Sequence, residues 1–119
     1  MGELALNMVL AGDLPRPVYP QALADSAASR WAVDASASLQ YAHRAITQRG
    51  DVLTALANAS RGIIEAAHSQ LARHKTWVLN EKGIADAAEL SAASESLLSV
   101  TSHTELRDAI ERAIDLIDA

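Results

Sequence analysis

Apolar residues recur every three or four positions along much of this chain, which is the spacing of one face of an amphipathic helix. The clearest stripe comprises Val52, Leu56, Ala59, Ile63, Ala67 and Leu71. It is widened on one side by Leu53, Ala57, Ile64 and Ala72. This pattern predicts a helix from Val52 to about Lys75, which at roughly 24 residues would be about 36 Å long.

A second long helix is expected before it, and local signals mark both ends. Its apolar face consists of Trp31, Ala35, Leu39, Ala42 and Ile46. Pro20 suits its first turn, and a bend is expected near Ser29 and Arg30. Gly50 is suited to end this helix, because glycine tolerates a left-handed backbone, and Asp51 is suited to cap the helix that follows.

Shorter helices are predicted toward both ends of the chain. Residues 3–11 favour a short helix, which Gly12 and the three prolines after it would terminate. Residues 84–100 are rich in alanine and serine and predict one or two short helices. Ser102 and Glu105 form a capping-box pattern, in which the serine caps a helix and the glutamate reaches back to the cap residue.

The last predicted helix extends to about Asp118, and its apolar positions are Leu106, Ala109, Ile110, Ala113, Ile114 and Ile117. Composition agrees with a helical fold, because the chain has 25 alanines and no phenylalanine. Alanine is the best helix former and allows helices to approach closely, whereas sheets favour β-branched and aromatic residues. Long helices joined by short turns therefore predict a single all-α domain over residues 1–119, an antiparallel bundle of four to five helices.

Charge is unevenly distributed around the net value of −5. Residues 43–82 carry six basic and three acidic groups, and residues 83–119 carry two basic and eight acidic groups. The middle third would best accommodate an anion such as phosphate, although solvated helix faces explain the same charges. A general nucleic-acid binder would be more basic, with aromatic residues interleaved.

Other sequence features bear on the cellular location. The apolar runs are too short for a membrane span, and Glu3 lies where a secretory signal would carry positive charge. The chain has no cysteine, which excludes disulfides and thiolate metal sites. A cytoplasmic protein without a membrane partner is expected.

Two pairs of polar residues within the helix predicted from Val52 to about Lys75 suggest chemistry. Glu65 and His68 have the spacing of helical di-metal carboxylate sites, but the chain has no second copy, so no metal site is predicted. Arg61 and His68, in "RGIIEAAH", have a spacing typical of HEPN-class ribonucleases, helical proteins in which such a pair would stabilise a phosphorane and move a proton. The spacing of Arg61 and His68 makes a metal-independent ribonuclease an alternative interpretation. The chain departs from the pattern at Gly62, which replaces the polar residue usual after that arginine.

Residues 74–88, "HKTWVLNEKGIADAA", break the helical period between two predicted helices. One interpretation is a turn, in which Asn80 and Gly83 shape the backbone and Glu81 and Lys82 are solvated. Trp77, Val78 and Leu79 would then be buried. The other interpretation is that Lys82 is presented to a ligand.

Three pieces in order, "VYPQAL" (18–23), "AITQRGDVLTAL" (45–56) and "HKTWVLNEKGIADAAEL" (74–90), resemble the C-terminal helical domain of nucleotidyltransferase-superfamily proteins. These proteins have a polymerase-β-like catalytic domain related to aminoglycoside nucleotidyltransferases. The resemblance covers about residues 18–90. It implies a helical bundle that packs beside a catalytic domain and helps to form the substrate cleft.

The superfamily's catalytic signature, Gly-Ser followed by paired aspartates that hold magnesium, does not occur in this chain. The resemblance therefore implies an accessory or substrate-binding domain without catalysis or cofactor of its own, beside a catalytic domain in cis or trans that would bring magnesium and nucleotide. By position, Lys82 would reach a triphosphate, Glu81 would bind a cationic, aminoglycoside-like substrate or tether Lys82, and Asn80 would shape the turn. A non-enzymatic interaction module and a homodimer also remain open.

Overall fold

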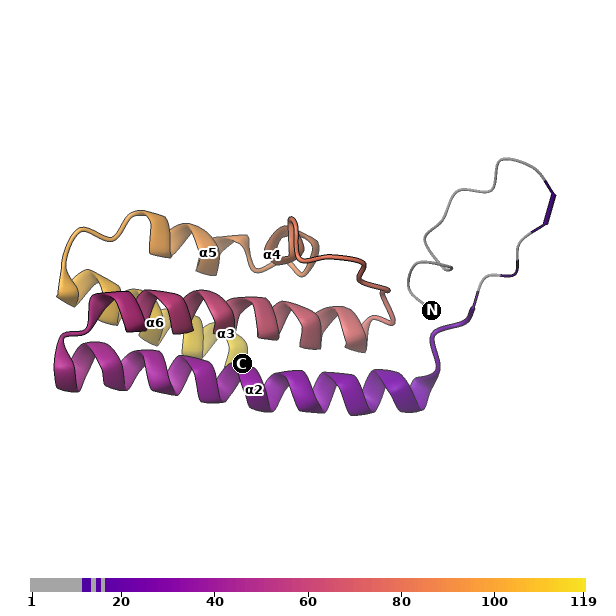
Figure 1. Ribbon diagram of the computed structural model, residues 1–119, viewed down its shortest axis with the longest axis horizontal. Helices are drawn as coiled ribbons and strands as arrows, with labels where there is room; N and C mark the ends of the chain where they lie inside the picture. The colour runs from indigo at the N-terminus through magenta and orange to yellow at the C-terminus, as the bar shows by residue number, and fades with distance from the viewer. Residues whose placement is uncertain (1–11, 14, 16) are drawn as a thin grey trace.

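The computed structural model describes residues 12, 13, 15 and 17–119, and every regular element in this part of the chain is a helix (Figure 1). The helices are α2 (Gln21–Arg49), α3 (Val52–Arg73), α4 (Ile84–Ala87), α5 (Ser91–Leu98) and α6 (His103–Asp118). They pack together, which confirms the all-α prediction. The short helix predicted at residues 3–11 lies outside the described residues. Within the described part, no helix combines the length and the apolar character needed to cross a membrane.

Helix α2 has the predicted limits and is continuous. Pro20 is its N-terminal cap residue, and the helix runs through Ser29 and Arg30 to Arg49 as a single element. It ends at Gly50, whose φ of 60° is in the left-handed region that glycine adopts at little cost. The amides of Gly50 and Asp51 then donate to carbonyls in the last turn of α2. The chain therefore reverses within two residues.

Helix α3 begins with the cap that its sequence predicts. The Asp51 carboxylate accepts a hydrogen bond of 3.1 Å from the Thr54 amide. Hydrogen bonds from the hydroxyl and the amide of Thr54 lower the pKa of Asp51, because they favour the charged carboxylate. The helix ends at Arg73, slightly before the predicted end at Lys75. Lys75 has a φ of 54°, outside the helical region, which explains the earlier end.

Helices α2 and α3 lie side by side along most of their length (Figure 1). Small residues form much of their contact. Ala35, Ala42, Ala59 and Ala67 are fully buried. Gly62 is also buried, and a Cβ atom there would lie 2.6 Å from the Leu39 Cγ and 3.3 Å from the Ala35 carbonyl oxygen. The two helices approach so closely at this point that only glycine fits without displacement.

The apolar stripe of α3 is narrower on one side than the sequence predicted. Leu53 is 79% exposed and Ala57 is also exposed, so these two residues do not widen the buried face as expected. The face instead extends through Gly62, Glu65 and Ser69, which are all buried. The periodicity identified the centre of the stripe, but it could not show which flank α2 would cover.

Helices α4, α5 and α6 complete the core. Three clusters of buried residues lie along the molecule, and Ile84 and Leu90 belong to the one around Leu71, at the end where α3 leads into α4. Helix α6 contacts both α2 and α3 and places Leu106 and Ile110 in the cluster near the α2–α3 turn.

The Ser102 cap is confirmed, because its hydroxyl accepts from the Glu105 amide at 3.2 Å. The Glu105 side chain also reaches back across the cap, as the capping box predicts. Its carboxylate accepts from the amide and the hydroxyl of Thr101, and the Ser102 backbone makes a smaller contribution. These hydrogen bonds lower the pKa of Glu105, and the hydroxyl of Thr101 has the largest effect.

Candidate functional site

The segment between α3 and α4 (residues 74–83) contains the candidate site, and its first half is attached to the bundle. The Thr76 amide donates to the Leu71 carbonyl at 2.8 Å. The Trp77 ring lies 4.4 Å from the Tyr19 ring, centroid to centroid, and Val78 packs against the core. These contacts fix the path of the chain as it leaves α3.

Only part of the predicted burial in this segment is present. Trp77 and Val78 are half-buried, whereas Leu79 is 51% exposed and is not the buried anchor that its apolar side chain suggested. The reason is geometric: Val78 reaches the core, and the backbone then turns away toward solvent. Tyr19, which precedes α2, supplies the partner for Trp77 and could not be paired with it from sequence spacing.

Asn80 and Gly83 shape the turn as expected. The Asn80 Oδ1 accepts a hydrogen bond of 2.9 Å from the Lys82 amide, which is a local side-chain turn typical of asparagine. Gly83 has a φ of 67° and is the N-terminal cap residue of α4. Lys82 is exposed and borders a hollow of about 280 Å³, whose lining includes Trp77 and Leu71. The turn therefore presents the Lys82 side chain at the edge of a concave surface.

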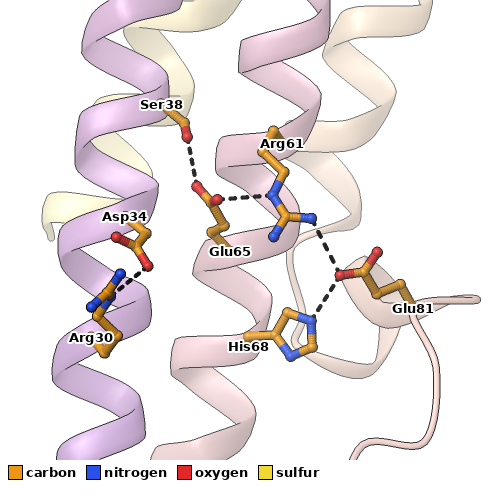
Figure 2. Close-up of polar contacts among 7 residues, drawn as sticks. All are labelled: Arg30, Asp34, Ser38, Arg61, Glu65, His68 and Glu81. Carbon is orange, nitrogen blue, oxygen red and sulfur yellow. Dashed lines mark hydrogen bonds and ion pairs between the residues drawn. The ribbon is translucent and has the colours of Figure 1, made fainter.

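Glu81 faces α3, where it meets the two residues of the predicted ribonuclease pair (Figure 2). Its Oε1 lies 3.0 Å from the His68 Nε2 and 3.5 Å from the Arg61 Nη1. His68 is well shielded, with 15% of its side chain exposed, whereas Glu81 and Arg61 are about half exposed. Arg61 and His68 are seven positions apart on α3, and both contact the same carboxylate, which comes from a different part of the chain.

Arg61 also binds a second carboxylate, on its own helix. Its Nε donates to the Glu65 Oε1 at 2.8 Å, and the other Glu65 oxygen accepts from the Ser38 hydroxyl at 2.7 Å (Figure 2). Glu65 is buried, with 9% of its side chain exposed, so these two donors compensate for the removal of its charge from water. Ser38 belongs to α2, and the contact therefore joins the two long helices.

An aromatic ring completes this arrangement. The Trp31 ring stacks on the His68 ring with centroids 4.4 Å apart and an interplanar angle of 15°, and the Arg61 guanidinium lies 5.9 Å from the Trp31 centroid. We call the whole set the Arg61 network: Trp31, Ser38, Arg61, Glu65, His68 and Glu81. Beside it, Arg30 and Asp34 form an ion pair of 2.9 Å within α2 (Figure 2).

The contacts in the Arg61 network bear on the metal site and the ribonuclease activity that the sequence spacing suggested. Glu65 and His68 have different partners, because the carboxylate faces Ser38 and Arg61 while the imidazole faces Glu81. A shared metal ion would require both side chains to give up these bonds. For the ribonuclease hypothesis, a phosphate at Arg61 would have to compete with two carboxylates that already bind it, which is electrostatically unfavourable.

Gly62 has a packing role that the motif comparison could not show. The residue after Arg61 faces α2, where the backbone of Ala35 and the side chain of Leu39 leave no room for a polar side chain. Its identity therefore follows from the close contact of the two helices.

Asn80, Glu81 and Lys82 thus occupy one turn, with Glu81 directed toward α3 and Lys82 at the edge of the hollow. Sequence reasoning found all three residues, but it missed Ser38 and the Trp31 stack. The spacing of Arg61 and Glu65 at i, i+4 was a usable signal for their ion pair. Comparison of the chain with protein-family models, with curated proteins and with solved structures finds no match.

Proposed function

We propose that this chain is a helical accessory and substrate-binding domain of a nucleotidyltransferase-like protein, without catalytic activity of its own. The observation that carries the proposal is the turn at residues 80–83, which holds an exposed lysine beside a hollow while its neighbours are engaged in the fold. In this arrangement the helices form an antiparallel cytoplasmic bundle that packs beside a catalytic domain, in cis or in trans.

Lys82 would contact the phosphate groups of a bound nucleotide and stabilise their negative charge. A lysine ammonium is a compact positive charge on a flexible stem, so it stabilises the negative oxygens of a triphosphate without demanding a fixed angle. Magnesium would be held by carboxylates of the catalytic domain and would supply positive charge to the reacting phosphate. The contribution of this chain is to place the positive charge of Lys82 at the edge of the substrate cleft beside the catalytic domain.

The contacts of Glu81 support one of its two expected roles over the other. Its Oε1 faces Arg61 and His68, so a cationic, aminoglycoside-like substrate would have to displace both groups. The tethering role requires no such displacement. We therefore assign triphosphate contact to Lys82 and support of the turn to Glu81 and Asn80.

The proposal is tested by isothermal titration with magnesium-ATP, magnesium-GTP and an aminoglycoside, on the chain alone and in the presence of its catalytic domain. Nucleotide binding is expected with the catalytic domain present, and Lys82→Met should abolish most of the heat. Lys75→Met is a matched control, because Lys75 is exposed in the same segment but does not border the hollow. No heat from any ligand, or an equal loss from both variants, would contradict the proposal.

The ribonuclease remains a second candidate because Arg61 and His68 do converge, with Arg61 46% exposed. Its requirement is that a phosphate displaces Glu81 from both residues. RNA cleavage in EDTA that His68→Ala abolishes, and that a His103→Ala control leaves unchanged, would favour this candidate. Cleavage that persists in the His68 variant would dismiss it.

A further inference from the structure

Lys82 lies in a stretch of the chain that has little hydrophobic attachment. Residues 79–83 are all exposed, whereas Val78 before them and Ile84 after them pack against the core. Within the turn, the Asn80 and Lys82 hydrogen bond is local and fixes curvature only. It does not determine where the turn lies relative to the helices.

Glu81 supplies that attachment. In the described part of the chain, the only side-chain ion pairs or hydrogen bonds that connect residues 79–83 to another element are those of the Glu81 carboxylate. They reach Arg61 and His68, which lie about two turns apart on one face of α3. A single carboxylate oxygen therefore meets two basic side chains of one rigid helix, through a hydrogen bond with His68 and an ion pair with Arg61.

The Arg61 and His68 side chains are themselves fixed by contacts made elsewhere. The His68 ring is stacked on Trp31 of α2, and Arg61 is held at its Nε by the buried Glu65. Neither side chain needs to be ordered when the turn docks, which reduces the entropic cost of forming the contact. Because Lys82 follows Glu81 directly, fixing Glu81 also fixes the point from which the lysine side chain extends.

We propose that Glu81 is a clasp that fastens the turn at residues 79–83 to α3, and that Arg61 and His68 are positioning residues that place Lys82 for an incoming phosphate. The clasp itself is a property of the free chain, whereas its consequence for phosphate binding rests on the proposed function. A preorganised lysine loses less freedom when it binds, so the clasp increases affinity without touching the ligand.

The test combines a measurement on the free chain with a measurement of binding. Hydrogen exchange at the Lys82 and Ile84 amides, followed by NMR, reports the order of the turn, because these amides donate to Asn80 and to the Glu81 carbonyl. Magnesium-ATP affinity, titrated with the catalytic domain present, reports the placement of Lys82. Glu81→Ala should accelerate exchange at both amides and weaken ATP binding about three- to tenfold.

Two further variants and one control distinguish a clasp from a general loss of stability. Glu81→Gln keeps an acceptor oxygen and should restore much of the slow exchange. His68→Phe keeps an aromatic ring against Trp31 but removes the donor, and it should accelerate exchange as Glu81→Ala does. Glu95→Ala removes an exposed glutamate on α5 and should change neither measurement. Replacing Arg61 is less informative, because it would leave the buried Glu65 without its ion-pair partner.

The outcomes separate this inference from the proposed function. Unchanged exchange in both Glu81→Ala and His68→Phe would overturn the clasp, whatever the nucleotide affinity. Accelerated exchange in a protein complex that does not bind ATP would establish the clasp and refute the proposed nucleotide role. Accelerated exchange with unchanged ATP affinity would overturn the claim that the clasp positions Lys82.

Discussion

Replacing Gly62 with alanine should destabilise the protein, although alanine is the better helix former. In the interior of a helix, glycine to alanine gains about 1 kcal/mol from helix propensity. At this position the new Cβ would lie 2.6 Å from the Leu39 Cγ, 3.0 Å from its Cδ2 and 3.3 Å from the Ala35 carbonyl oxygen. The first distance is far below a normal carbon–carbon contact, so α2 and α3 must separate or Leu39 must move.

Leu39 has little room to move, because it is 1% exposed and belongs to a cluster with Ile63, Ala93 and Ala113. Overpacking of this kind typically costs about 1–3 kcal/mol. With the propensity gain subtracted, we expect Gly62→Ala to lower the free energy of unfolding by roughly 1 kcal/mol, which for a chain of this length lowers Tm by about 4 °C. Urea unfolding followed by far-UV circular dichroism measures the change directly.

A double-mutant cycle tests the cause. Leu39→Ala alone should cost about 2–5 kcal/mol because it opens a cavity. In the Gly62→Ala background it should cost at least about 0.5 kcal/mol less, because the added methyl group occupies part of that cavity. Ser60→Ala, at an exposed position of α3, is the control and should be neutral or slightly stabilising. If Gly62→Ala raised stability by the full propensity gain, the close approach of the two helices would be refuted.

Other substitutions test the remaining contacts. Ser69→Ala removes a buried hydrogen bond of 2.8 Å to the Ala28 carbonyl and should lower the free energy of unfolding by about 0.5–1.5 kcal/mol in urea unfolding; no change would mean that the bond does not join α2 to α3. Ser102→Ala removes the cap of α6 and should lower the free energy of unfolding by about 1 kcal/mol in the same assay. Ser102→Asn, which keeps a capping side chain, should retain most of that stability. The pKa values of Asp51 and Glu105 are lowered in the folded state. The two carboxylates therefore contribute stability above their unfolded pKa values of about 4, and this stability is lost as the pH falls through their lower folded pKa values. Asp51→Asn keeps a capping side chain but does not titrate, and it should flatten the decline in Tm measured between neutral pH and pH 3; an unchanged pH profile would contradict the assigned role of Asp51.

Much of the fold follows from features local in sequence. Gly50 and Asp51 mark the α2–α3 turn because a left-handed cap and a side-chain cap depend on neighbouring residues alone. The centre of each apolar stripe is equally local, since helical period determines which residues share a face. The exposure of Leu53 and the burial of Ser69 depend instead on where α2 crosses α3, which no local pattern specifies.

The candidate site divides in the same way. Asn80 and Gly83 were predictable as turn residues, because the asparagine side chain bonds the nearby backbone and glycine, which lacks a Cβ, tolerates a positive φ. The contact of Glu81 with His68 joins residues on two elements, and its existence depends on how far the segment folds back along α3. Sequence spacing placed Arg61 and His68 on one helix but gave no indication that a carboxylate would lie between them.

The small residues of the α2–α3 contact affect how the protein would tolerate mutation. Leu39, Leu106 and Ile110 are the largest side chains in the described part that are fully buried, and most other interior positions are alanine. Truncation to alanine can therefore remove few atoms from this interior, and a conventional alanine scan would find few sensitive sites. Substitutions that add atoms should be damaging at many positions. A saturation scan should show sensitivity that rises with side-chain volume along one face of each long helix, so that variants of this chain are constrained mainly by an upper limit on size.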